Sequence, residues 1–379
     1  MNSSTLLVDI ESGALSPGKH SAVRGIHLLH VVGPVTDEVF SFLGPATRAL
    51  ARHGHVQHIV VIDSPEHRHN VGQLDEYASV VRVKKASNPL SQWAGVIRAC
   101  RELVSENGLS VVHVHGLVPF LLISLALRSL DGQTPVVYSP HGSRSLGTLR
   151  FAGKLAMLAA HSAIRPARSS AIVTVRSEGG AFNRWKGTDI VESPVPDLFF
   201  SVPRREAEKP LIITGGRKNS ERSIEVFTQL AVLLSDEELG LEFNWLGTVH
   251  ANSRQRLRAA SVSVLPISSD RECADHMAAG WMYVAPWSTR GFPLFLVQAM
   301  AAGLPCVALD CDQHREVIEH GKTGFLCASE QEMVRQIAAL VDDSDLRDRI
   351  GAAARVSTEE RFSESHFDDK LLTAYATRW

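Results

Sequence analysis

The feature that most constrains the fold is an alternation, from about residue 24 onward, of short apolar runs with longer helix-like segments. The apolar runs predict strands at 26–32, 58–62, 80–83, 111–115 and 136–139, and the segments between them predict helices at 40–53, 90–105 and 117–130. Near-continuous apolar strands that alternate with helices are typical of a parallel sheet covered on both faces. The first half of the chain is therefore predicted to be a doubly wound α/β domain.

The alternation breaks at residues 192–210, where prolines and a charged cluster at 204–209 indicate a linker. A second series follows, with strands predicted at 211–214, 242–246, 262–266, 282–285 and 306–309, and helices at 224–234 and 294–302. We therefore expect two Rossmann-like domains that face each other across a cleft. A ligand would bind at the carboxyl ends of the strands.

Composition excludes several other classes of protein. The formal net charge of −2 gives no reason to expect nucleic-acid binding. The five cysteines are scattered without a CxxC pair, so they indicate neither a disulfide framework nor a zinc site, but reduced thiols in a cytoplasmic protein. The longest apolar stretch, 117–127, is too short to span a bilayer. Residues 1–23 lack periodicity and are expected to form a flexible tail.

One segment carries a specific family pattern. Residues 290–326 read RGFPLFLVQAMAAGLPCVALDCDQHREVIEHGKTGFL. This segment resembles the donor-site signature of the retaining family-4 glycosyltransferases, also called glycosyl transferases group 1. Weaker similarities lie at 49–63, 111–116, 135–142, 173–178 and 211–223. The resemblance implies a GT-B fold with an acceptor-side domain at 24–200, a nucleotide-sugar donor domain at 201–361, and a helix at 362–379 that crosses back to the first domain.

The residues around Gly291 also have a physical interpretation that does not depend on the family. Gly291 opens a turn directly before a helix predicted to start near Leu294, and Pro293 is favoured at a helix start. Amides at a helix N-terminus point outward and carry the positive end of the dipole, so they suit a phosphate or a sugar hydroxyl. The alternative is an ordinary loop that Pro293 caps.

The resemblance assigns roles to individual residues. It places His141 in the cleft near the donor sugar, where imidazole can donate to a hydroxyl or share charge on the leaving phosphate; this makes His141 the catalytic candidate. Arg217 and Arg222 would hold the diphosphate. The donor-binding candidates are Gly33, Gly216, Arg217, Arg222, Ile267, Arg290, Gly291, Phe292, Pro293, Leu294, Gln298 and Glu316.

Two pairs of residues, one of histidines and one of aspartates, could be ligands of a metal ion. His113 and His115 alternate on a strand and share one face, but histidines in an apolar run usually pack in a core. Asp310 and Asp312 form a DxD, which holds a metal in GT-A enzymes, yet the surrounding sequence resembles the GT-B class that usually needs none. We therefore expect neither a metal nor a cofactor.

The sequence departs from the family at both signature glutamates, which are replaced by Arg290 and Gln298. Gln298 can still accept one hydrogen bond, though a weaker one than a carboxylate accepts. Arg290 reverses the charge beside the donor sugar, which suggests an anionic partner such as the donor diphosphate, an acidic donor sugar, or a carboxylate of the protein such as Glu272 or Glu316.

The predicted function is transfer of a sugar from a UDP- or GDP-sugar to a glycan or lipid-linked acceptor, in cell-surface polysaccharide or glycoconjugate synthesis. The alternatives are a non-catalytic partner of another transferase, favoured by the lost glutamates, and a nucleotide-sugar epimerase. The basic stretch 144–168 indicates either a solvated helix face or peripheral contact with the inner face of a membrane.

Overall fold

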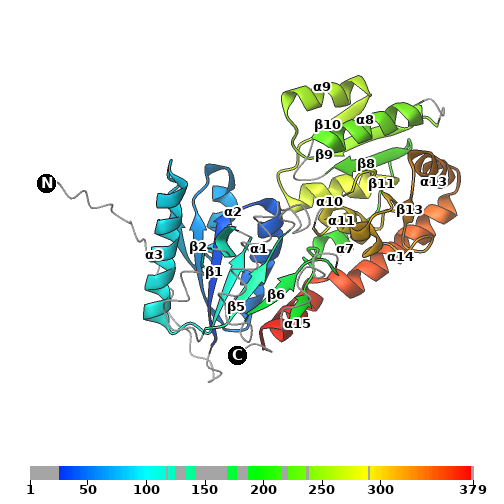
Figure 1. Cartoon of the computed structure of the whole chain (residues 1–379). Helices are drawn as coiled ribbons and strands as arrows, with labels where there is room; N and C mark the ends of the chain where they lie inside the picture. Colours follow the sequence, from blue (N-terminus) through cyan, green and yellow to red (C-terminus); the bar gives the residue numbers. More distant parts are fainter. Residues whose placement is uncertain are drawn as a thin grey trace. The chain divides into compact units, whose positions relative to one another are not determined.

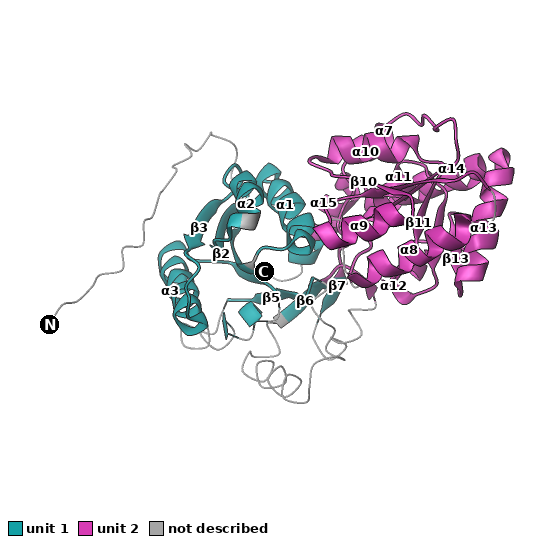
Figure 2. Ribbon diagram, turned by 90° about the horizontal axis from the view of Figure 1, so that it is seen from above, with its two compact units in different colours: residues 1–172, 182–189, 372–379 teal, residues 173–181, 190–371 magenta. Residues whose placement is uncertain are grey.

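The structure is a computed structural model of the whole chain, and it describes residues 25–116, 118–120, 122–123, 134–141, 169–176, 187–215, 221–235, 239–288 and 291–376. It divides into two compact units (Figure 2). Unit 1 comprises Met1–Ile172, Phe182–Asp189 and Leu372–Trp379, and unit 2 comprises Val173–Ala181 and Ile190–Leu371. The helix predicted at 117–130 and the basic stretch 144–168 lie largely outside the described residues.

Unit 1 is built on a seven-stranded sheet with the order β3-β2-β1-β4-β5-β6-β7. Its strands are β1 (His27–Pro34), β2 (Val56–Ile62), β3 (Ser79–Val83), β4 (Val111–His115), β5 (Val136–Ser139), β6 (Ser169–Val173) and β7 (Thr188–Ile190). The pairings from β3 to β6 are parallel. The direction of winding reverses between β1 and β4, which is the place where open α/β sheets bind ligands beyond the strand ends.

Helices cover both sides of this sheet, with α1 (Asp37–Arg52) and α3 (Pro89–Asn107) on either side of the strands in Figure 1. A further helix, α2, spans Arg68–Leu74. The sequence predicted that α1 starts at residue 40. It starts earlier because the Thr36 hydroxyl accepts a hydrogen bond from the Val39 amide and caps the helix.

Unit 2 contains a six-stranded sheet with the order β10-β9-β8-β11-β12-β13. The strands are β8 (Leu211–Gly215), β9 (Glu242–Leu246), β10 (Val262–Leu265), β11 (Met282–Ala285), β12 (Cys306–Leu309) and β13 (Phe325–Cys327). The helices are α7 (Leu198–Ser201), α8 (Glu221–Ser235), α9 (Ala251–Ala259), α10 (Asp270–Ala279), α11 (Leu294–Ala301), α12 (Asp312–Arg315), α13 (Glu330–Asp342), α14 (Ser344–Phe362) and α15 (Glu364–Ala376), the last of which ends in unit 1.

Consecutive residues of the unit 2 strands pack into different cores. On β8, Ile213 joins a cluster with Met300 of α11, whereas its neighbour Ile212 joins a cluster with Phe227 of α8 and Ile337 of α13. This alternation shows that both faces of the sheet are buried under helices. The doubly wound architecture predicted from the apolar strands is confirmed in each unit.

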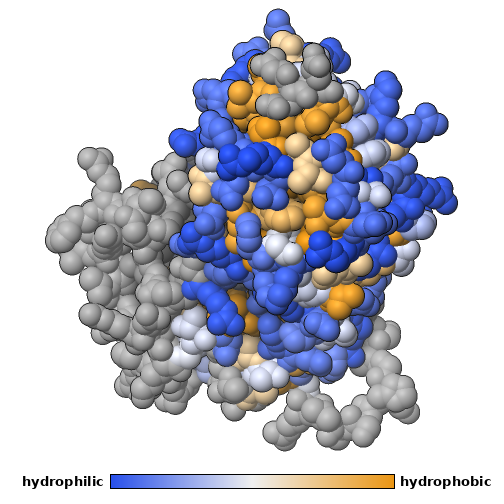
Figure 3. Space-filling view, turned by 90° about the vertical axis from the view of Figure 1, so that its right-hand side faces the viewer, coloured by the Kyte–Doolittle hydropathy of each residue, from blue (hydrophilic) through white to orange (hydrophobic). Residues whose placement is uncertain are grey.

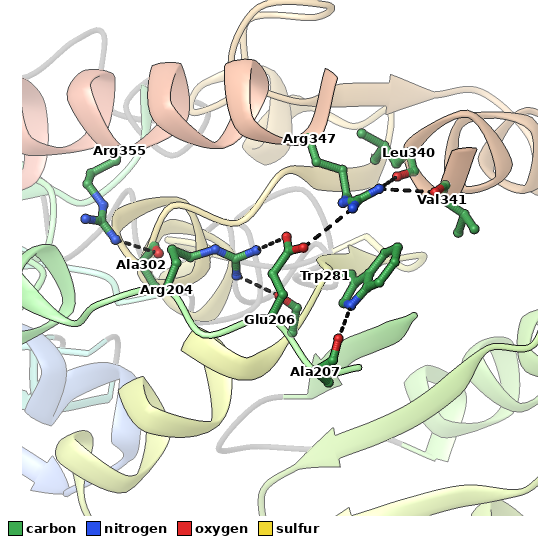
Figure 4. A network of polar contacts seen from close by, with 10 residues as sticks. Arg204, Glu206, Ala207, Trp281, Ala302, Leu340, Val341, Arg347 and Arg355 are labelled. Atoms are coloured by element: carbon green, nitrogen blue, oxygen red, sulfur yellow. Dashed lines mark hydrogen bonds and ion pairs between the residues drawn. The ribbon is translucent and has the colours of Figure 1, made fainter. Parts of the chain in front are cut away.

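The charged cluster at 204–209, predicted as part of a linker, is fixed to unit 2 by polar contacts (Figure 4). Arg204 donates hydrogen bonds to the Gly280 carbonyl and to Glu206. Arg347 lies 3.5 Å from the other oxygen of Glu206, donates to two carbonyls at the end of α13, and stacks 4.0 Å over the Trp281 ring. The sequence showed charges without their partners, which lie on distant helices, so this packing was not predicted.

Replacing Arg347 by alanine is expected to lower the free energy of unfolding of unit 2 by about 3 kcal/mol. The side chain is buried, and its loss would remove a stacking partner and leave buried carbonyls without a donor. Urea unfolding followed by tryptophan fluorescence measures the effect. The matched control is Arg349→Ala, an exposed arginine on the same helix. Equal losses in the two variants would contradict the structural role of Arg347.

The face seen in Figure 3 is mainly hydrophilic, with hydrophobic patches between the charged side chains, the most extensive in the upper part of the view. Large exposed hydrophobic residues in unit 2 include Val232 and Leu233 on α8 and Val356 on α14. Among the described residues, no helix combines the length and the hydropathy needed to cross a membrane.

Candidate active site

His141 lies just after β5, at the carboxyl edge of the unit 1 sheet, and it is buried with 6% of its surface exposed. Its backbone has a φ of +48°, a left-handed conformation that few non-glycine residues adopt. Such outliers persist only where the surrounding structure holds them. The side chain is accordingly packed, with its ring centroid 5.2 Å from that of Phe42 on α1.

Three further histidines lie beside it on one face of the sheet. Register pairs His30 of β1 with His113 of β4, and Val32 with His115, so these imidazoles point to the same side. His30 Nδ1 is 3.1 Å from His115 Nε2, and His115 Nδ1 is 2.8 Å from His141 Nε2. The three rings therefore form a hydrogen-bonded chain that ends at His141.

Burial keeps these imidazoles neutral. It lowers the pKa of His30 to about 4 and that of His141 to about 3. The pKa of His115 is lowered well below its usual value by burial and by the neighbouring histidines. Desolvation penalises the charged form, so at neutral pH each ring carries one proton and can both donate and accept a hydrogen bond.

His113 belongs to a separate set of contacts. The Ser139 hydroxyl donates to the Ile172 carbonyl at 2.7 Å, so it accepts from His113 Nε2 at 2.8 Å. His113 Nδ1 therefore accepts from the Tyr375 hydroxyl at the end of α15. Both ring nitrogens are thus engaged, and Tyr375 fixes the end of the C-terminal helix to the sheet of unit 1.

The nitrogen atoms of His30, His113 and His115 lie within 4.8 Å of one another, as ligands of a metal ion would. A metal needs a free lone pair from each histidine, whereas both nitrogens of His113 already have hydrogen-bond partners. The donor set therefore fits a hydrogen-bonded network better than a metal centre.

In unit 2, the turn before α11 has the predicted form. Gly291 has a φ of +74°, and the helix begins at Leu294 after Pro293. One turn further on, Gln298 is buried, and its Oε1 has no hydrogen-bond partner within the described ranges. A buried acceptor without a partner is costly, and a ligand that donates to it would remove that cost.

Glu316 lies at a small recess that Phe292 also lines. Its carboxylate accepts a hydrogen bond of 2.7 Å from the Arg176 amide, and its carbonyl accepts one of 2.6 Å from Arg361. All four residues belong to unit 2, so the structure brings Glu316 and Phe292 of the predicted donor site together.

The other predicted site residues are dispersed or not described. Gly33 lies on β1, where an added Cβ would meet the side chain of Pro119 at 3.2 Å, a tight contact that glycine avoids. Arg222 is exposed in the first turn of α8, and Ile267 packs against the core after β10. Gly216, Arg217 and Arg290 lie outside the described residues.

The Asp310–Asp312 pair has an ionic partner of its own. Arg315 forms ion pairs with Asp310 at 2.5 Å and with Asp312 at 3.5 Å. The Arg315 guanidinium lowers the pKa of Asp310. Both carboxylates are therefore paired with one arginine, and their arrangement provides no support for a metal bridge to a diphosphate.

Sequence reasoning missed His30 and Gln57, which lies beside His30 on the neighbouring strand. His30 could have been recognised from the sequence, because it is a histidine within the predicted apolar strand 26–32, as His113 and His115 are within the predicted strand 111–115. Strand order was needed to place the two side by side, and an isolated glutamine in an apolar strand carried no signal of its own.

Comparisons with known proteins cover both units. Two family descriptions match, "Glycosyltransferase Family 4" over residues 46–178 and "Glycosyl transferases group 1" over residues 209–343. Together these ranges include more than half of the chain, with one match in each half of the sequence.

Individual relatives are distant but cover most of the chain. An uncharacterised glycosyltransferase of Haemophilus influenzae is 23% identical over 76% of this chain and 83% of that protein. A phosphatidyl-myo-inositol mannosyltransferase of Mycobacterium tuberculosis is 24% identical over 74% and 77%. The crystal structure of Anabaena HepE in complex with UDP and glucose aligns with a TM-score of 0.73 and 14% identity, over 93% of this chain and 100% of that one.

Proposed function

This chain belongs to the GT-B glycosyltransferases, which transfer a sugar from a nucleotide sugar, and from that premise we propose a more specific reaction. The donor is a UDP-sugar, the acceptor is a glycan or a lipid-linked glycan, and transfer retains the configuration at the anomeric carbon. The HepE structure, which holds UDP and glucose, supports the choice of nucleotide, and the mannosyltransferase supports a lipid-linked acceptor.

The observation that carries this proposal is the Oε1 of buried Gln298, which is unpaired among the residues that the structure describes. It lies on α11, one turn after the Gly291 turn, at the position where the family resemblance implies contact with the ribose. A ribose hydroxyl that donates to Oε1 would satisfy the buried acceptor. The helix N-terminus at Leu294 would then face the diphosphate, together with Arg217 and Arg222.

His141 is the group proposed to act near the reacting sugar. It follows a parallel strand at the carboxyl edge of the sheet, and its Nδ1 is buried without a partner in the part of the chain that the structure describes. Because the ring is neutral, it can form a hydrogen bond to a sugar hydroxyl without introducing a charge. The chemistry would depend on stabilising the departing diphosphate and on excluding water from the donor.

Calorimetry with UDP, GDP and ADP tests the donor assignment. We expect UDP to bind to the wild type and Gln298→Leu to weaken that binding about 5- to 10-fold, the effect of one neutral hydrogen bond. The control is Gln331→Leu, which changes an exposed glutamine on α13. No binding of any of the three nucleotides at millimolar concentration would favour a non-catalytic relative of the transferases instead.

Proton NMR of the product tests retention, because α- and β-anomers differ in the coupling of the anomeric proton. A product with the anomeric configuration of the donor supports the proposal. The opposite configuration would overturn retention while leaving the transferase activity itself established.

A further inference from the structure

The direction of the hydrogen bonds along the buried histidines can be deduced from one glutamine. Gln57 of β2 is buried, and its Nε2 donates to the carbonyls of Thr47 at 2.9 Å and Tyr77 at 3.4 Å. Both partners are acceptors, so the orientation of the amide is fixed. Its remaining polar atom, Oε1, is a buried acceptor for which the described residues provide no other hydrogen bond.

His30 lies next to that acceptor. Leu28, two residues before His30 on β1, is the register partner of Gln57, so the side chains of His30 and Gln57 lie on the same face of the sheet. His30 Nε2 is also buried without a hydrogen-bond partner among the described residues. A proton on Nε2 that points at Oε1 of Gln57 gives both buried atoms a partner. The contact with Gln57, which raises the pKa of His30 against the larger lowering by burial, agrees with this orientation. His30 therefore carries its proton on Nε2, toward Gln57, and its Nδ1 is a bare acceptor.

The position of the proton on each following ring is then determined. Because His30 Nδ1 has no proton, the 3.1 Å contact requires His115 to donate from Nε2. His115 is neutral and has only that proton, so its Nδ1 is bare. The 2.8 Å contact then requires His141 to donate from Nε2. His141 is also neutral, which leaves its Nδ1 as a lone pair with no partner among the described residues.

We propose that Gln57, His30 and His115 are positioning residues that hold His141 as the Nε2-protonated tautomer, so that its Nδ1 accepts a hydrogen bond from a hydroxyl of a bound sugar. This inference rests on the proposed function for the identity of the ligand. It excludes donation by Nδ1 to the leaving diphosphate. An imidazole that accepts from a hydroxyl orients that hydroxyl and increases the electron density on its oxygen.

Nitrogen-15 NMR of the histidine-labelled protein tests the tautomer directly, because protonated and bare ring nitrogens differ strongly in chemical shift. The His141 signals are assigned as those missing from the His141→Asn spectrum. We expect a bare Nδ1 and a protonated Nε2 in the wild type at neutral pH. A protonated Nδ1 would overturn the proposal, as would one zinc ion per chain that a chelator removes with a change in these signals.

Two substitutions at His115 test the effect on turnover. In His115→Asn the amide oxygen can accept from His141 Nε2, whereas His115→Leu offers no acceptor. We expect the leucine variant to lose at least 10-fold in kcat with little change in donor KM and with mixed His141 tautomers. The asparagine variant should recover part of the kcat. Equal losses in both variants, with the wild-type tautomer kept, would overturn the positioning role.

The same spectra separate this proposal from the proposed function. Addition of UDP-glucose, UDP-galactose or UDP-N-acetylglucosamine should move the His141 Nδ1 signal if a sugar hydroxyl donates to it. A moved signal without turnover would contradict the transferase assignment only. Turnover with an unmoved Nδ1 signal in the presence of the accepted donor and acceptor would overturn the contact proposed here.

Discussion

Acidification from about pH 8 to about pH 4 is expected to destabilise unit 1 by several kcal/mol, because its buried histidines resist protonation. Burial lowers the pKa of His30 to about 4 and that of His141 to about 3, whereas an unfolded histidine titrates near 6.5. Below pH 6.5 the unfolded chain therefore binds protons that the folded chain does not. Stability is complete above that pH and falls as the pH decreases toward the folded pKa, by about 3 kcal/mol for each histidine.

Urea unfolding at a series of pH values measures this dependence, with far-UV circular dichroism as the signal. His30→Gln should lower the slope of the unfolding free energy against pH between about pH 6.5 and about pH 4, because one titrating group is gone. The control is His69→Gln, which changes an exposed histidine of the same unit. A wild-type protein whose stability does not change over this range would contradict the neutral, buried state of the histidines.

Much of the fold could be predicted from the sequence, because strands buried in a parallel sheet have continuous apolar sequences. The strand at 111–115 and the strands at 136–139, 242–246, 282–285 and 306–309 coincide with the observed elements. Short or polar elements gave no such signal. The strand β7 has three residues, and the helix α9 contains three arginines and little apolar surface, so neither was predicted.

The candidate site was predictable only in part. Some of its features depend on residues that are adjacent in the sequence, and others depend on residues that are far apart in it. The Gly291 turn and the start of α11 are local, and a glycine followed by a proline and an apolar helix indicates them directly. The histidine chain is not local, since it joins β1, β4 and the end of β5, and its direction depends on Gln57 from β2. Only the strand order brings these four segments together.

The arginine contacts of unit 2 illustrate the same limit. The charged residues at 204–209 have the composition of a linker. Nothing nearby in the sequence shows that Arg347 pairs with Glu206 or that Trp281 donates to the Ala207 carbonyl. A charged side chain can be buried where an oppositely charged partner offsets its loss of hydration. Here the partners are Glu206 and Arg347, which are more than a hundred residues apart in the sequence. The composition of this segment therefore did not reveal that it packs on unit 2.

Replacing His141 by alanine is expected to reduce kcat at least 100-fold while donor KM changes little. The neutral imidazole would contact the reacting sugar through Nδ1, and an interaction that strengthens in the transition state affects the rate more than ground-state binding. Initial rates over a range of donor concentrations, at saturating acceptor, separate the two parameters. The wild-type pH profile should show no acidic limb from His141 near neutrality, because burial lowers its pKa to about 3.

The companion variant is His141→Asn, which tolerates the left-handed backbone at a φ of +48° better than alanine does. The amide would keep a polar group at this place without an imidazole. If turnover depends on the ring nitrogen, both variants lose activity although the asparagine protein stays folded, as its thermal unfolding would verify. If the alanine variant alone is inactive and also unfolds more readily, the defect lies in the strained backbone. Wild-type kcat in the asparagine variant would then remove His141 from the reaction and leave it a structural residue.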